Sequence, residues 1–398
     1  MPFQDPRPSA AAAANFASLA GRRVWRKRAA ELAGRVAARS LEGRAARARH
    51  ALELMLARAA EAPPEAPTLA ERRALAFAEE AVRLAASLPA QARARLRARI
   101  EAALSGDETL IPLFHLLRTA LLQRARGYEV AFTGLTDATP WDLTIRSGDT
   151  VAEIVCETVS AEDGRALHRG AWCRLVDRVN PELQTWLAAH PGRYVLKITL
   201  PEGLSGPEGL PALQRRILDM LAAEKRADQS ADAILKLDPL VLGAAQAGAA
   251  LPAELRAQFG PEAHLAVTTA PGGGGVFVMA ARAGRENAIS EALARRAAAV
   301  APVRLSGERP GILALFLDEV ERGEWRALRE SLEIEGAVRR FLTGAAARPV
   351  VAVTCASRME LFGLAPPDAA PAGELRFRNP RHRLATQPDL QAAIAPTL

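Results

Sequence analysis

Residues 114–160 read FHLLRTALLQRARGYEVAFTGLTDATPWDLTIRSGDTVAEIVCETVS, and residues 182–201 read ELQTWLAAHPGRYVLKITLP. The first stretch begins with apolar residues at helical spacing and then changes to short segments in which apolar and polar residues alternate, a pattern typical of strands. Gly127 follows the helical segment as a C-terminal cap would. The pattern predicts a helix over 111–126 and strands over 128–133, 141–145, 151–160 and 194–200, with a helical region before the last strand.

Three acidic residues accompany these strands. Glu153 and Glu157 fall on one face of the strand over 151–160 because side chains alternate with a period of two, and Asp142 lies on the strand before it. The three carboxylates can therefore converge at one end of a hairpin. Carboxylates held together stay ionised beside a divalent cation or a basic partner, and oxygen-only ligands suit Mg²⁺ or Mn²⁺. Such a site can activate water and clamp a phosphodiester. The alternative is that the three acids are solvated residues at strand ends.

The order of these elements resembles the PD-(D/E)xK nuclease superfamily, which has the restriction-endonuclease-like fold. The matching residues are Pro140-Trp141-Asp142 on the second strand and Glu153 to Glu157 on the third, followed by a helix and a strand. The resemblance implies an αβββαβ core over 108–202. It also implies that Asp142 and Glu153 or Glu157 bind the metal ion.

The lysine of this family, which orients water and charge, stands two residues after the glutamate. That position is Val155 here. Lys197, on the strand over 194–200, is a candidate for a migrated lysine, and Gln184, on the helix before it, is a candidate residue beside the site. The alternative for both is a solvated polar side chain.

Positive charge is concentrated near the start of the chain. The formal net charge is +7, and residues 1–58 alone hold 12 Lys and Arg against four Asp and Glu, so the rest of the chain is near neutral. A basic helical segment could bind nucleic-acid phosphates by releasing counterions; a solvated helix face is the alternative. The candidate phosphate-binding residues are Arg22, Arg23, Arg26, Lys27 and Arg28 in this segment and Arg169 at the start of the later helix.

Composition narrows the protein class. The three cysteines are odd in number and lie far apart, so neither a disulfide framework nor a zinc knuckle is indicated, and a cytoplasmic location is expected. No run of 18 apolar residues suggests a membrane span. The expected organisation is α/β, with a helical N-terminal extension, the nuclease-like core and a C-terminal α/β region. The expected segments are a basic arm at 1–61, a helical unit at 68–107, the core at 108–202, a connector at 203–261, an α/β region at 262–363 and a basic tail at 364–398.

Two function classes follow. The first is a DNA-associated protein with a metal-dependent phosphodiesterase site that uses Mg²⁺ or Mn²⁺. The second is a nuclease-fold scaffold or interaction protein without enzymatic activity, whose partner is another protein. Val155 at the lysine position and the near-neutral charge after residue 58 favour the second class; the order of the acids and the basic N-terminal segment favour the first.

Overall fold

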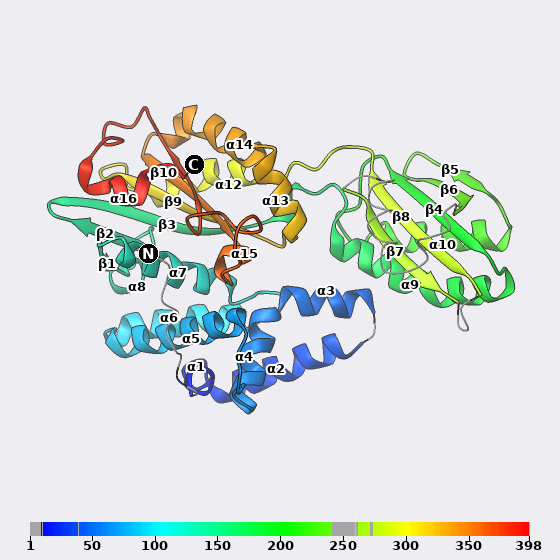
Figure 1. Ribbon diagram of the computed structural model, residues 1–398, viewed down its shortest axis with the longest axis horizontal. Helices are drawn as coiled ribbons and strands as arrows, with labels where there is room; N and C mark the ends of the chain where they lie inside the picture. Colours follow the sequence, from blue (N-terminus) through cyan, green and yellow to red (C-terminus); the bar gives the residue numbers. More distant parts are fainter. Residues whose placement is uncertain are drawn as a thin grey trace. The chain divides into compact units, whose positions relative to one another are not determined.

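The computed structural model describes residues 9, 11–38, 40–240, 259, 262–270 and 274–397. These residues form a mixed α/β protein that divides into two compact units. The first unit comprises 1–34, 49–163 and 290–398, and the second comprises 35–48 and 164–289. The second unit is thus built from two segments that interrupt the first unit in the sequence (Figure 1).

The first unit is organised around a six-stranded mixed sheet with the order β1-β2-β3-β9-β10-β11. The first three strands are antiparallel neighbours, β3, β9 and β10 run parallel, and β11 is antiparallel to β10. The strands are β1 Glu129–Ala131, β2 Leu143–Ser147, β3 Thr150–Ser160, β9 Gly311–Asp318, β10 Val350–Ser357 and β11 Leu375–Arg378.

Strands β9 and β10 lie in the middle of this sheet, and all their residues are buried. Their continuous apolar sequence predicts central strands covered on both faces, and this prediction is confirmed. The sequence leaves open whether they form a separate α/β unit or extend the first sheet. They extend it, because Glu153 to Ser160 of β3 pair with Gly311 to Asp318 of β9.

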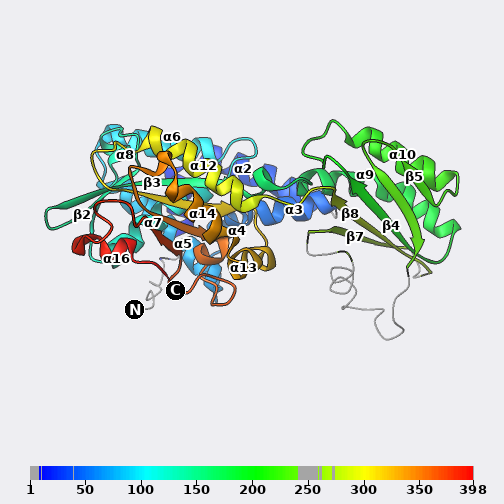
Figure 2. The same ribbon diagram turned by 90° about the horizontal axis from the view of Figure 1, so that it is seen from above.

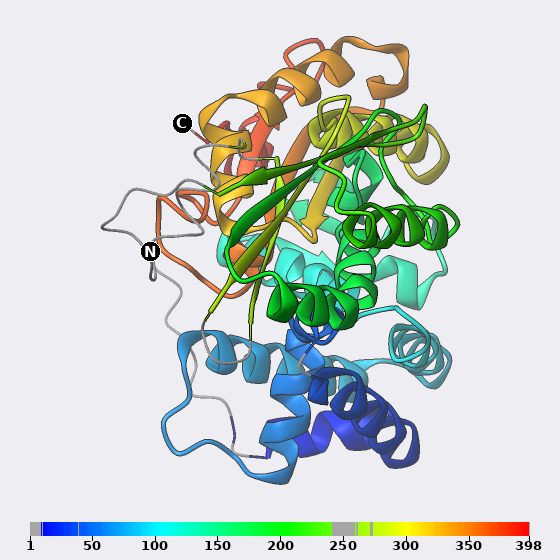
Figure 3. The ribbon, with the colours of Figure 1, turned by 90° about the vertical axis from the view of Figure 1, so that its right-hand side faces the viewer.

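Helices cover both faces of this sheet. Figures 1 and 3 show α7 on one face and α12 and α14 on the other. On the α7 face, Ile312, Ala314 and Phe316 of β9 join one hydrophobic core with the N-terminal helices, in which Phe16 and Phe114 pack edge to face at 6.1 Å. The helices whose residues lie wholly or mostly in the first unit are α1 Ala12–Leu19, α2 Arg22–Ala37, α4 Ala51–Glu61, α5 Leu69–Ser87, α6 Ala90–Ala103, α7 Ile111–Ala125, α8 Thr133–Thr136, α12 Ile289–Arg304, α13 Arg322–Glu330, α14 Glu333–Thr343, α15 Arg358–Leu361 and α16 Gln391–Ile394.

The second unit contains a five-stranded mixed sheet with the order β5-β6-β4-β8-β7. Helices α9 and α10 lie on the same face of it and share one hydrophobic core with its strands (Figure 2). The elements are α3 Leu41–Arg49, α9 Arg169–Ala189, β4 Arg193–Leu200, α10 Leu210–Ala222, β5 Ala227–Gln229, β6 Ile234–Pro239, β7 His264–Thr269 and β8 Val276–Ala283.

The longer segment of the second unit, residues 164–289, begins and ends at adjacent points of the backbone. The amide of Ala288 donates to the carbonyl of Gly164 at 2.7 Å. A Cβ atom at Gly164 would lie 2.4 Å from the Cα of Ile289, closer than real Cβ contacts come, so this crossing requires glycine.

The expected core over 108–202 is wrong in its second half. Helix α9 and strand β4 belong to the second unit, and the helix and strand that follow β3 in the first unit are α12 and β9. The other expected boundaries also differ. Helices from 1–61 and 68–107 share one core, but 35–48 belong to the second unit. The described part of 203–261 supplies β5 and β6 to the second sheet, and the remainder of that segment lies outside the described residues. The region 262–363 is divided between the two sheets, and the tail at 364–398 supplies β11. Local periodicity identifies a strand but not its neighbour, and β3 pairs with a strand about 160 residues later in the chain.

Candidate functional site

The three acidic residues predicted as metal ligands all lie in the first unit. Asp142 directly precedes β2, and Glu153 and Glu157 are on β3. The amide of Asp142 donates to the carbonyl of Ile154 at 2.9 Å, and its Oδ2 accepts a hydrogen bond from the amide of Cys156 at 2.9 Å. Asp142 is therefore fixed against β3 by both its backbone and its side chain. We call Asp142, Glu153 and Glu157 the acidic cluster.

Arginine side chains occupy the space between two of these acids. Arg304, the last residue of α12, places Nη2 2.8 Å from Asp142 Oδ2 and Nη1 3.2 Å from Glu157 Oε2. Its Nε donates to the carbonyl of Pro140 at 2.8 Å. One guanidinium thus bridges two carboxylates and the backbone of the loop before β2, and each of its three nitrogens donates one hydrogen bond.

Two more arginines complete this network. Arg99 on α6 places Nη1 3.2 Å from Asp142 Oδ1, and Arg296 on α12 donates from Nε to Glu157 Oε1 at 2.9 Å. The carboxylates of Asp142 and Glu157 therefore face three guanidinium groups, which supply the basic partners that ionised neighbouring carboxylates require.

Glu153 has a different environment. Its side chain is 1% exposed and accepts hydrogen bonds from the hydroxyl of Ser306 at 2.7 Å and from the amide of Ser306 at 2.9 Å. Glu153 thus fixes the loop between α12 and β9. The expected convergence of all three acids is only partial, because Glu153 does not share Arg304 with the other two.

The acidic cluster does not offer the ligand set that Mg²⁺ or Mn²⁺ would need. In the described part of the chain, no group of three or more His, Cys, Asp or Glu side chains is arranged to hold a metal ion. Arginines or a serine occupy the carboxylates, and Val155, at the position of the lysine, is buried and apolar. Desolvation, together with the nearby Asp142 carboxylate, raises the pKa of the Cys156 thiol well above its ordinary value.

Gln184, Lys197 and Arg169 belong to the second unit and not to the unit that contains the acids. Lys197 on β4 forms an ion pair with Asp238 on β6 at 2.9 Å, which gives it a structural partner within its own sheet. Gln184 is exposed on α9 and lines a groove. The migrated-lysine interpretation therefore has no geometric support within either unit.

The basic N-terminal segment is a helix with one exposed basic face. Arg22, Arg23, Arg26 and Lys27 on α2 are exposed. Arg28 is 3% exposed and donates to the carbonyls of Gly106 at 2.7 Å and Glu108 at 2.8 Å. The assignment of Arg28 to phosphate binding is wrong, because its guanidinium is buried and already donates to two backbone carbonyls.

A second ion-pair cluster lies where parallel strands of the first unit end. Glu319, after β9, accepts a hydrogen bond from the Ser160 hydroxyl at 2.5 Å and forms an ion pair with Arg49. Asp318 accepts from Arg358 Nη2 at 3.2 Å. Burial alone would raise the pKa of the Glu319 carboxyl, but the hydrogen bond from Ser160 and the Arg49 cation outweigh it and lower this pKa.

Four residues of the site are not revealed by the sequence: Arg99, Arg296, Arg304 and Ser306. Arg99 belongs to the ARARLRAR run of α6, and Arg304 lies 147 residues after Glu157, so no local spacing connects them with the acids. The only signal is the arginine content of two helices, which is equally typical of solvated helix faces.

Comparison with known proteins identifies no protein that is similar to this chain. No family model matches the chain, and neither a curated protein nor a solved structure is significantly similar to it. Among the described helices, none has the length and apolar character required to cross a membrane. Any functional proposal therefore depends on the geometry of the residues themselves.

Proposed function

We propose that the first unit is a nuclease-like scaffold that has no phosphodiesterase activity and acts by binding a partner. The order α7, β1, β2, β3, α12 and β9, with the short helix α8 between β1 and β2, supports the nuclease-like part of this proposal. It has the expected succession of helix, three strands, helix and strand, and its four strands belong to one sheet. The second unit then stands as an insertion between β3 and α12.

The observation that carries the proposal is the position of Arg304. Its guanidinium, between Asp142 and Glu157, provides the positive charge that a metal ion would otherwise provide to these acids. A guanidinium cannot be deprotonated in proteins and does not generate a bound hydroxide, which is what a metal-bound water supplies in hydrolysis. The arginine stabilises the fold around the acids without giving them a hydrolytic role.

A cleavage assay tests the absence of activity. Supercoiled plasmid and single-stranded circular DNA would be incubated with wild-type protein and with the variants Asp142→Ala and Glu153→Ala, in Mg²⁺ or Mn²⁺, beside a known metal-dependent nuclease. We expect no cleavage above the buffer control with any of the three proteins. Cleavage by the wild type that disappears in both variants would contradict the proposal.

Nucleic-acid association is a second candidate function, and it depends on the exposed face of α2. Four basic side chains lie within six residues there, and of these only Lys27 has a carboxylate nearby in the described part of the chain, Glu31 at 3.8 Å. Charge of this kind binds DNA without sequence preference and with a steep dependence on salt.

A salt titration tests this second candidate. The affinity for a labelled DNA duplex would be measured at several NaCl concentrations with wild type and with a variant in which Arg22, Arg23, Arg26 and Lys27 are glutamine. Each lost phosphate contact is expected to reduce the salt slope by roughly 0.9. The control variant Arg326→Gln Arg339→Gln removes exposed charge elsewhere. Equal slopes for all three proteins would exclude α2 as a DNA-binding face.

A further inference from the structure

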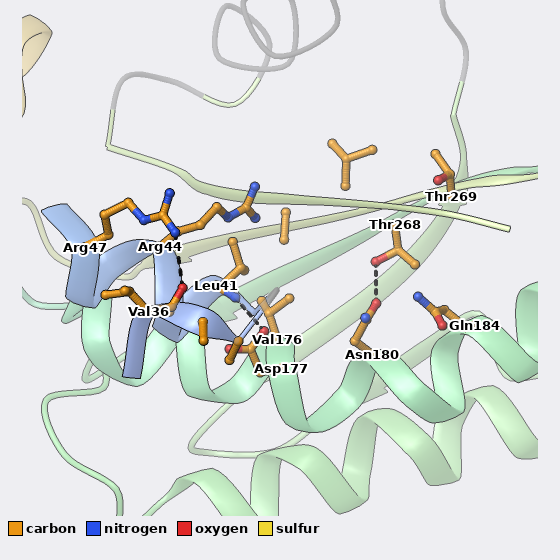
Figure 4. Close-up of a pocket in the computed structure, with 15 residues that line it drawn as sticks. Val36, Leu41, Arg44, Arg47, Val176, Asp177, Asn180, Gln184, Thr268 and Thr269 are labelled. Carbon is orange, nitrogen blue, oxygen red and sulfur yellow. Dashed lines mark hydrogen bonds between the residues drawn. The ribbon is translucent and has the colours of Figure 1, made fainter. Parts of the chain in front are cut away.

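The second unit contains a groove of about 610 Å³ between strand β7 and helices α9 and α3. Figure 4 shows its two ends: Arg44 and Arg47 lie at one, and Asn180, Gln184, Thr268 and Thr269 lie at the other. Because β7 is an edge strand of the sheet, one wall of this groove is a strand edge.

The hydrogen bonds at the β7–β8 turn define which backbone groups face the groove edge. The amide of Ala270 donates to the carbonyl of Gly275 at 3.0 Å, so Ala270 and every second residue before it pair with β8. The amides and carbonyls of Val267 and Thr269 therefore point away from β8. Within the described part of the chain, neither residue forms a further backbone hydrogen bond. An edge of this kind is a template for an additional strand.

The opposite wall is held in place by its own contacts. The carboxylate of Asp177 on α9 accepts hydrogen bonds from the amides of Leu41 and Glu42 at 2.8 Å each and so caps the start of α3. The hydroxyl of Thr268 donates to Asn180 Oδ1 at 2.9 Å, which ties β7 to α9. The groove is thus lined by elements that are fixed to one another.

Positive charge is available at one end of the groove. Arg44 and Arg47 are exposed on α3, and among the described residues neither forms an ion pair. Arg47 makes one hydrogen bond, to the carbonyl of Val36 at 3.2 Å. The only carboxylate in the described lining belongs to Asp177, and the α3 amides occupy it. A negatively charged group of a ligand could therefore pair with Arg44 and Arg47, because no other carboxylate of the described lining is available to them.

We propose that this groove binds an extended peptide segment of a partner protein, which adds as a strand to β7 and places an acidic side chain against Arg44 and Arg47. Val267, whose side chain is 43% exposed, and Thr269, two residues later on β7, provide an apolar and a polar contact for alternate residues of such a segment. The described lining contains no aromatic side chain on which a base could stack, so a single-stranded nucleic acid is a poorer match than a peptide. The proposal is independent of whether the acidic cluster of the first unit cleaves DNA.

The edge can be tested with a proline. Val267→Pro removes one outward amide without removing a hydrogen bond to β8, and proline is tolerated at sheet edges. Val267→Ala is the matched control, because it shortens the same side chain and keeps the amide. Arg44→Glu Arg47→Glu reverses the charge at the other end of the groove, and Arg44→Lys Arg47→Lys is its control. Thermal unfolding of each variant would verify that it is folded.

The probe is a phage-displayed library of random 12-residue peptides selected on the full-length protein. We expect enriched peptides with alternating β-branched residues and at least one Asp or Glu. A synthetic copy of the most enriched peptide should bind at least about tenfold more weakly to Val267→Pro than to Val267→Ala. It should also bind at least about tenfold more weakly to the Arg44→Glu Arg47→Glu variant than to the Arg44→Lys Arg47→Lys variant. Hydrogen exchange should show slower exchange at the amides of Val267 and Thr269 when the peptide is bound.

Several results would overturn the proposal. Selection that yields no peptide above background excludes peptide binding, and a peptide that binds the proline variant as well as wild type excludes strand addition. Displacement of the selected peptide by an oligothymidylate would assign the groove to nucleic acid. Sedimentation showing a dimer that Val267→Pro dissociates would assign it to a second copy of the chain.

Discussion

Replacing Arg304 by alanine should destabilise the first unit substantially. The Arg304 side chain is 26% exposed and donates three hydrogen bonds, two of them to carboxylates. A hydrogen bond that involves a charged group contributes about 1.5–3 kcal/mol, and removing one partner of a buried ion pair costs about 3–5 kcal/mol. In the variant, Asp142 would still pair with Arg99 and Glu157 with Arg296. We therefore expect the free energy of unfolding to fall by about 3 kcal/mol, the lower limit of the range for a buried ion pair.

The measurement is the free energy of unfolding in urea, followed by circular dichroism, with hydrogen exchange over residues 141–160 to assign the loss to the β2–β3 hairpin. Arg295→Ala is the matched control, because Arg295 lies on the same helix and makes one long contact, to the carbonyl of Asp163 at 3.3 Å. Its effect should stay within about 0.5 kcal/mol. Equal stability of the two variants, or a loss in Arg304→Ala that leaves exchange over 141–160 unchanged, would refute the bridging role of Arg304.

Other outcomes follow from the same structure. The pKa of Glu319 is lowered in the folded protein, so its carboxylate contributes stability fully above its ordinary pKa of 4.5, and this contribution is lost as the pH falls through the lowered value. The stability difference between wild type and Glu319→Gln in urea titrations should therefore be largest at neutral pH and vanish in acid; a difference independent of pH would contradict this. Arg28→Ala should cost about 2–3 kcal/mol because it removes a buried guanidinium that donates to the carbonyls of Gly106 and Glu108, whereas Lys27→Ala should stay within about 0.5 kcal/mol. Equal thermal unfolding of the two variants would disprove the structural role of Arg28. Because arginines pair with Asp142 and Glu157, we expect Mg²⁺ or Mn²⁺ to leave the Tm unchanged. A cation that bound the folded protein, present at 100 times its Kd, would raise the free energy of unfolding by about 2.7 kcal/mol. A rise in Tm that Asp142→Ala abolishes would therefore establish a metal site.

Local sequence pattern predicts much of the secondary structure of the first unit. The turn at Ser147-Gly148-Asp149 and the alternation before and after it place the β2–β3 hairpin within two residues of its observed bounds. The apolar run from Gly311 places β9 correctly for a related reason, since a strand buried on both faces shows an unbroken apolar run instead of a period of two.

The neighbours of these elements could not be predicted in the same way. A helix and a strand, α9 and β4, follow β3 directly in the sequence, and nothing in their local pattern shows that β4 belongs to another sheet than β3. In the first unit, α12 and β9 are the helix and strand that follow β3. The choice is made by strand pairing between β3 and β9, which are separated by the whole of residues 164–289. Arg304 escapes prediction because its role depends on this same pairing, which places the end of α12 beside Asp142.

The close crossing at Gly164 and Ala288 has a consequence for engineering the chain. Because the longer segment of the second unit leaves and returns at adjacent points, a short linker between Asp163 and Ser290 should excise it genetically and keep β3 and α12 in one chain. The same junction should accept an unrelated cargo module whose own termini are close together. Residues 35–48 would need redesign in either case, because the cap that Asp177 provides for α3 is removed with the excised segment.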